Sequence, residues 1–160
     1  MRGIRKFLGG AVLLGSAIGL CFVPQRASSK LPQEQSTAPS GTEEAVPAFH
    51  SKAPQGELPA TINPDLFTDP VVQNAYTVAA KIKKTLYQQP CYCHCDRSHG
   101  HTSLLDCFTS KHGSVCGTCV YEDFYSYEQS RKGKIAAQIR AGIIKGEWQS
   151  VDVTPYRSKN

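Results

Sequence analysis

Residues 90–119 read PCYCHCDRSHGHTSLLDCFTSKHGSVCGTC and hold six of the seven cysteines and four of the five histidines of this 160-residue chain. Thiolate and imidazole groups are the ligands that Zn²⁺ and Cu(I) prefer in proteins. Carboxylates are scarce between them, which argues against Ca²⁺ and Mg²⁺. The stretch therefore predicts a compact site for soft metal ions, around which a small domain is organised.

The spacing of the first three cysteines limits how they can share an ion. Cys91, Cys93 and Cys95 alternate with Tyr92 and His94. In an extended chain the three sulfurs share one face, and the first and last Cα atoms lie about 13 Å apart, which is too far for one ion. Either the segment curls around a metal, or its thiolates are divided between neighbouring ions or bridge them.

The remaining cysteines lie beside predicted helices. Cys116-Gly117-Thr118-Cys119 has the two-residue gap that lets both sulfurs reach one ion. This motif opens a predicted helix, whose N-terminus favours the thiolate forms. Cys107 adds a sixth sulfur from a short predicted helix, and ligation by at least one of the four nearby histidines is expected.

A disulfide framework is the main alternative, because six cysteines in a small exported domain are typical of one. Cysteines two residues apart rarely pair, since the Cβ separation and dihedral angle of the bond are hard to meet. That restriction leaves six of the 15 connectivities. The alternative disulfides then join one set of three to the other: Cys91, Cys93 and Cys95 to Cys107, Cys116 and Cys119. The adjacent histidines favour the metal site, because a disulfide framework has no use for them.

The first residues have the layout of a secretory signal. A basic start precedes an apolar stretch over residues 7–23. Small residues then lead to Ser29, so we expect residues 1–29 to direct export to the periplasm or cell envelope and to be cleaved. An uncleaved membrane anchor and a lipid on Cys21 are the alternatives, although Leu20 stands where a lipobox has Gly, Ala or Ser.

Residues 30–66 have the composition of a linker. They hold six of the ten prolines, among Ser, Thr, Gln and Glu. Such a stretch cannot bury enough apolar surface to offset its chain entropy, and we expect it to be disordered, with His50 in solvent. Residues 67–160 remain for one domain, a size at which a thin core often needs covalent or metal staples.

Helical periodicity predicts an all-α domain, because no segment alternates over the length of a strand. Asp69 followed by Pro70 is a helix start, and Pro90 ends that helix at Gln89. The predicted helices span residues 70–89, 103–108, 117–132 and 134–145. The third is expected to turn Val120, Phe124 and Tyr127 inward, and the fourth to carry Ile135, Ile139 and Ile143 on one buried stripe.

Other functions find little support in the sequence. The formal net charge of +5 owes four cations to the leader, and the rest form no cluster, so nucleic-acid binding is not expected. Haem attachment needs a histidine after the second cysteine of CxxC, and position 120 is valine. No Cys/His pair stands out as a nucleophile and base, so we do not expect an enzyme.

The segments at 90–95, 100–108, 112–113 and 116–119 resemble the PCYCGC-motif family of bacterial exported proteins, which are often lipoproteins. The likeness spans roughly residues 75 to 145, and His94 stands where the family has glycine. No settled activity comes with the family. The resemblance implies that one constellation acts together, with His94 and His99 as weaker members: Cys91, Cys93, Cys95, His101, Cys107, His112, Cys116 and Cys119.

The sequence thus predicts an exported cell-envelope protein that binds Cu(I) or Zn, as one ion or several, for sequestration or relay. Any contact with the membrane is expected through an uncleaved or lipidated N-terminus. The alternative is a disulfide-stapled extracytoplasmic module that presents the aromatic face of the third predicted helix to a protein partner.

Overall fold

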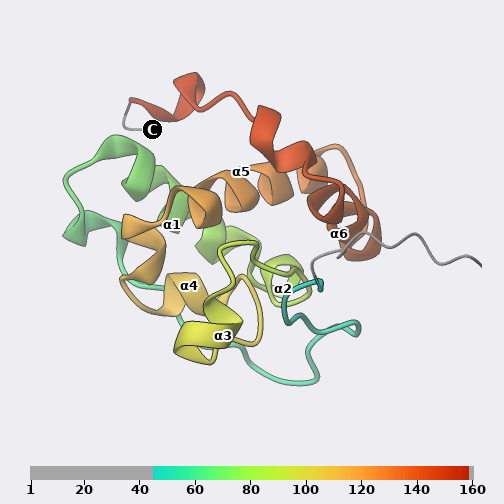
Figure 1. Cartoon of the computed structure of the whole chain (residues 1–160). Helices are drawn as coiled ribbons and strands as arrows, with labels where there is room; N and C mark the ends of the chain where they lie inside the picture. The colour runs from blue at the N-terminus through green and yellow to red at the C-terminus, as the bar shows by residue number, and fades with distance from the viewer. Residues whose placement is uncertain (1–44, 159–160) are drawn as a thin grey trace, which may run out of the picture. The chain divides into compact units, whose positions relative to one another are not determined.

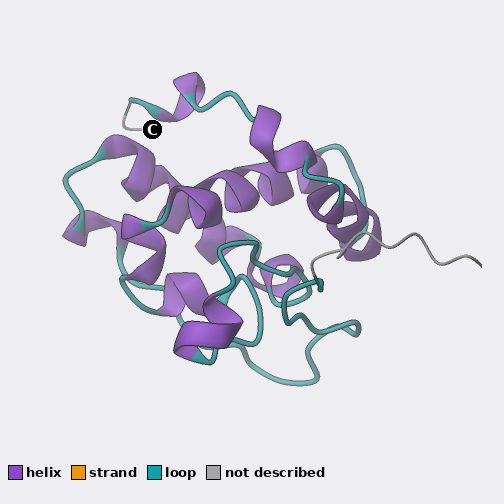
Figure 2. Ribbon diagram, viewed as in Figure 1, coloured by secondary structure: helices purple, strands orange, loops and turns teal. Residues whose placement is uncertain are grey.

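The computed structural model of the chain describes residues 45–158, which contain six α-helices, four 3₁₀ turns and no strand (Figures 1 and 2). The predicted all-α class is therefore confirmed. The signal segment, Cys21 and the first part of the expected linker lie outside the described residues. No helix within residues 45–158 is both long enough and apolar enough to cross a membrane.

The first predicted helix forms but is broken. Helix α1 (Pro70–Lys81) begins as expected, with Asp69 Oδ1 accepting from the backbone N–H of Val71 at 2.7 Å. It ends at Ile82, where φ is −118° and ψ is 26°, and α2 (Lys83–Leu86) follows. The side chain of Ile82 packs against the core, and Leu86 is fully buried. Ile82 is itself the break and Leu86 ends α2, so the burial of these two side chains outweighs the helical propensity of the segment.

Helix α5 (Gly117–Arg131) lies in the middle of the molecule and contacts α1, α2 and α6 (Ala136–Ile144) (Figure 1). It also contacts two 3₁₀ turns, η2 (His112–Val115) and η3 (Glu147–Ser150). Because neighbours cover α5 on several sides, it buries Glu122 and Asp123 as well as its apolar residues. Gly133, with φ +80°, follows the helix at the predicted stop.

Helix α6 packs through Ile139 and Ile143, which are fully buried against Tyr125. The prediction that Ile135 belongs to this stripe was wrong, since that side chain is 65% exposed. It caps the helix in an extended conformation, with its N–H bonded to the side chain of Gln138, and so lies off the helical face.

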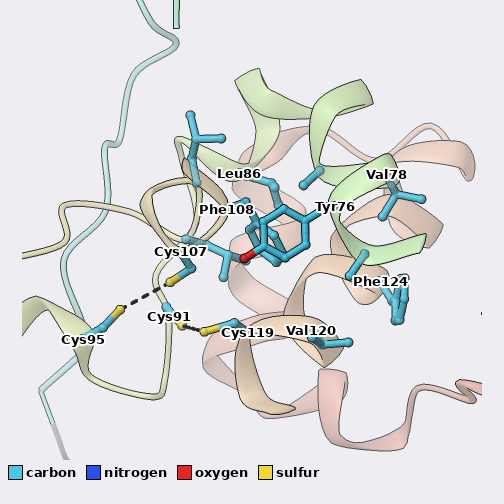
Figure 3. Packing of buried hydrophobic residues seen from close by; sticks show 14 of the residues in the cluster. Tyr76, Val78, Leu86, Cys91, Cys95, Cys107, Phe108, Cys119, Val120 and Phe124 are labelled. Carbon is cyan, nitrogen blue, oxygen red and sulfur yellow. Dashed lines mark hydrogen bonds between the residues drawn. The ribbon is translucent and has the colours of Figure 1, made fainter. Parts of the chain in front are cut away.

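The main hydrophobic core contains cysteine side chains as well as aliphatic and aromatic ones. Tyr76 and Phe108 pack edge to face with ring centroids 5.1 Å apart, and Phe124 stacks on Tyr156 of η4 (Thr154–Tyr156) at 3.7 Å. Figure 3 shows Cys107 beside the rings of Tyr76 and Phe108, with Cys91 and Cys119 close by and Cys95 pointing toward Cys107. Those four are buried members of the same cluster: Cys91, Cys95, Cys107 and Cys119. The sulfur site is therefore an extension of the hydrophobic core.

Residues 45–62, here called the strap, pack on the helices, in contrast to the disordered linker expected there. Ile62 N–H donates to the carbonyl of Phe108 at 2.9 Å. The ring of His50 stacks on Tyr87 at 3.9 Å and is half-buried, so the expectation that it lies in solvent was wrong. The turn η1 (Pro64–Leu66) then leads into α1. The strap has no helical periodicity, and it is fixed against the helices by widely spaced apolar residues and by hydrogen bonds of its backbone.

Candidate metal centre

The segment Cys91–Cys95 curls, as a shared site requires. The N–H of His94 donates to the carbonyl of Cys91 at 3.0 Å, which closes a turn. His94 itself has φ 54° and ψ 35°, in the left-handed region, and α3 (Cys95–His99) begins at the next residue. A carboxyl oxygen of Glu122, Oε1, accepts from Tyr92 N–H at 2.9 Å and fixes the turn from the side of α5.

Two further helices bring the other sulfurs to this turn, and the 3₁₀ turn η2 brings His112. Cys107 lies in α4 (Asp106–Thr109), and Cys116 and Cys119 lie at the cap and in the first turn of α5. The positive end of that helix favours anionic sulfur. Gly113 permits the close packing of η2 on α4, because a Cβ atom there would lie 3.0 Å from the carbonyl oxygen of Cys107. This approach places His112 beside the sulfurs.

The sulfur atoms lie in contact without being bonded. Cys91 Sγ is 3.3 Å from Cys93 Sγ. Figure 3 shows two further contacts, from Cys91 Sγ to Cys119 Sγ at 3.4 Å and from Cys95 Sγ to Cys107 Sγ at 3.5 Å. A disulfide needs about 2.05 Å. Two sulfurs on a tetrahedral Zn²⁺, with Zn–S bonds near 2.3 Å, lie about 3.8 Å apart. All six cysteines between residues 45 and 158 are free thiols, so the alternative disulfide framework is not formed.

The side chains form three groups that could each hold a metal ion. Each group has four members, whose ligand atoms all lie within 4.8 Å of one another. The first group is made of thiols alone: Cys91, Cys93, Cys107 and Cys119. The other two each include an imidazole: Cys93, Cys95, Cys107 and His112, and Cys93, His112, Cys116 and Cys119. The structure thus brings together all six predicted cysteines and His112, and Cys93 belongs to every group.

The other histidines lie at the edge of the centre. His101 Nδ1 is 3.4 Å from Cys107 Sγ, although His101 is in none of the three groups. Burial, followed by the neighbouring His112, lowers the pKa of His101 and so favours the neutral imidazole that ligates metals. His99 is exposed, and its ring packs edge-on against both of these histidines. His94 contributes no ligand atom to the three groups and lies 4.0 Å from Asp96.

Contact between the thiols shifts their pKa values in opposite directions. Hydrogen bonds from Cys107, and then from Cys119 and Cys91, lower the pKa of Cys93 far below its usual range. Hydrogen bonding with Cys119, Cys91 and their neighbours raises the pKa of Cys107. The neighbouring thiols thus favour the thiolate form of Cys93. A metal ion would replace the protons of those thiols.

Two buried carboxyl groups were not predicted from the sequence. Glu122 and Asp123 are both fully buried on α5. Burial raises the pKa of Glu122 to about 8, despite the hydrogen bond from Tyr92 N–H, and raises that of Asp123 well above its usual range. Glu122 follows Cys119 by three residues, which puts both on one helical face. That spacing was the signal in the sequence that Glu122 lies near the ligands.

The strap covers one side of the centre. Ala48 N–H donates to Asp96 Oδ2 at 3.1 Å. Pro47 and Ala48 line a narrow crevice together with Cys91, Cys95 and three polar neighbours. Cys91 and Cys95 are buried on that side, whereas Cys93, Cys116 and His112 are half-buried.

The aromatic residues of α5 do not form the exposed face that the alternative function needs. Phe124 and Tyr125 are buried, one in each hydrophobic cluster. Tyr121 and Tyr127 are half-buried.

The chain matches a known protein family over most of its described residues. The family described as "protein of unknown function with PCYCGC motif" matches residues 51–152. The chain belongs to this family. The motif reads PCYCHC here, and the left-handed φ of 54° at His94 explains a glycine in the family's motif, because glycine adopts this conformation without strain. Neither the curated proteins nor the solved structures gave a match to the chain.

Proposed function

We propose that this PCYCGC-family protein is exported to the cell envelope and binds soft metal ions, Cu(I) or Zn²⁺, for sequestration or relay. The observation that carries the proposal is the convergence of six free thiols and His112, from four helical elements and a turn, into groups whose ligand atoms lie within 4.8 Å of one another. Proteins that only pack cysteines in a core have no reason to gather all of them with an imidazole.

The donor set supports binding rather than catalysis. Each of the three groups offers four ligands, which completes the tetrahedral coordination of a closed Zn²⁺ site. Catalytic zinc sites keep one position open for water or substrate. Thiolate-rich sites also suit Cu(I), which is a soft ion. No carboxylate belongs to any of the three groups, so hard ions such as Mg²⁺ have no matching ligands there.

The exposure of the ligands supports exchange with the surroundings. Cys91, Cys95, Cys107 and Cys119 are buried, whereas Cys93, Cys116 and His112 are half-buried. An ion arriving from solvent meets these three ligands first, and they form one of the tetrahedral groups together with Cys119. Such a gradient from accessible to buried ligands fits a protein that takes up or hands over metal.

The test is the metal content of the native protein. The mature chain is purified anaerobically from the cell envelope, and Cu and Zn are measured by elemental analysis alongside the intact mass and the free-thiol count. We expect bound Cu or Zn and reduced cysteines. Metal-free protein lighter by the roughly six hydrogens that three disulfides remove would refute the proposal. Recovery of the protein from the cytoplasm alone would refute its export.

A further inference from the structure

The three ligand groups overlap in a regular way. Each group contains one cysteine that belongs to no other: Cys91, Cys95 or Cys116. Any two groups share two ligands, and one of the shared pair is always Cys93. The second shared ligand is Cys107, Cys119 or His112, depending on the pair. Three separate metal sites would not share ligands. A single metal site would not need three cysteines that each belong to only one group.

From this overlap we propose that the centre holds a cluster of three ions, with the thiolate of Cys93 in contact with all of them. The inference rests on the proposed function and specifies it further. Cys107 and Cys119 each bridge two ions, while Cys91, Cys95 and Cys116 each bind one. A thiolate sulfur has several lone pairs and bridges ions in this way.

Imidazole obeys a stricter rule, because a neutral ring has one acceptor nitrogen and binds one ion. His112 therefore serves either the group with Cys95 or the group with Cys116, although it lies within reach of both. If it binds the ion of Cys116, the ion of Cys95 and Cys107 lacks a fourth ligand. His101 Nδ1 lies 3.4 Å from Cys107 Sγ, and a shift of its ring toward Cys95 would let it supply that ligand. With His101 included, each of the three ions has four ligands.

Charge favours Zn²⁺ as the ion that fills this cluster. Six thiolates carry six negative charges, and three divalent ions balance them. A buried site with a large net charge is costly, and four of the six cysteines are buried. A single divalent ion would bind at most four of the sulfurs. The others would remain protonated thiols with no metal to bind.

The test compares Zn²⁺ stoichiometry in variants by native mass spectrometry of the anaerobically loaded mature protein. We expect three Zn²⁺ per chain for the wild type and two for Cys116→Ala, which removes a ligand of one ion. Cys93→Ala removes the ligand common to all and should retain one or none. Ser98→Ala is the matched control, because Ser98 is exposed in α3 and outside the three groups, and it should retain three.

The outcomes separate the two proposals. One Zn²⁺ per wild-type chain, or equal stoichiometries for Cys93→Ala and Cys116→Ala, would overturn the cluster and leave metal binding intact. Binding of neither Zn²⁺ nor Cu(I) would overturn both. Should Cys93→Ala fail to fold by circular dichroism, wild-type protein loaded with ¹¹³Cd²⁺ decides the question by NMR. Three mutually coupled cadmium signals support shared sulfurs, and uncoupled signals refute them.

Discussion

Replacement of Glu122 by glutamine should change how the stability of the domain depends on pH. The carboxyl group is fully buried, and its pKa in the folded protein is about 8, against about 4.3 for glutamate in an unfolded chain. Between these values the folded state keeps a proton that the unfolded state releases. The stabilisation is therefore fully present below about pH 4.3 and is lost as the pH rises through about 8.

The size of the effect follows from the width of that window. Each pH unit costs about 1.4 kcal/mol of unfolding free energy for one such group. Between pH 5 and pH 7.5 the loss is roughly 3 kcal/mol, a large part of the stability of a small domain. Glutamine does not titrate, and its carbonyl oxygen still accepts from Tyr92 N–H, so Glu122→Gln should lack this loss.

Urea denaturation of the reduced, metal-free domain, followed by circular dichroism at several pH values, measures the difference. Contributions from other titrating groups are common to both proteins and cancel in the comparison. Glu57→Gln is the matched control, because Glu57 is exposed, and its curve should follow the wild type. Parallel pH dependences for wild type and Glu122→Gln would refute the reasoning that a buried proton stabilises this turn.

Further predictions concern packing and metal. Phe108→Ala should cost about 3–5 kcal/mol in urea denaturation, because the ring is fully buried beside the sulfurs, and a cost below about 1 kcal/mol would contradict its place in the core. Gly142→Ala should lower the melting temperature by several degrees, since the new Cβ would lie 1.8 Å from the hydroxyl of Tyr125 and displace it from Glu147; an unchanged melting curve would count against that contact. Zn²⁺ at about 100 times its dissociation constant should stabilise the domain by about 2.7 kcal/mol. A thermal melt should show the shift, and a chelator should reverse it. An unchanged melting temperature would mean that the native state does not bind Zn²⁺ in preference to the unfolded state.

Features with a local physical cause were predictable from the sequence. The all-α class followed from helical periodicity, and the start of α1 followed from the Asp69-Pro70 pair. The stop at Gly133 needed only a residue that adopts positive φ. The convergence of the cysteines was also predictable in kind, because donors crowded into one short stretch cannot lie far apart, and the geometric argument required Cys91–Cys95 to curl.

Features set by distant contacts were not predictable in this way. The break at Ile82 depends on how that side chain packs against the core, and the periodicity of the sequence carries no information on this packing. Packing of the strap depends on surfaces such as the ring of Tyr87 and the carbonyl of Phe108, which exist only once the helices have assembled. The sharing of Cys93 among three ligand groups likewise depends on where α4 and α5 present their sulfurs.

The strap also has a mechanical consequence. It joins the helices to whatever precedes residue 45, so a pull on the chain from that side is transmitted to the strap first. The hydrogen bond from Ala48 to Asp96 and the stack of His50 on Tyr87 would be loaded one after the other, as in peeling, which needs little force. Tension would therefore act on the contacts of Pro47 and Ala48 beside Cys91 and Cys95 before it reaches the helices. In this arrangement, the part of the chain that covers Cys91 and Cys95 is also the part that first carries a load applied from the N-terminal side.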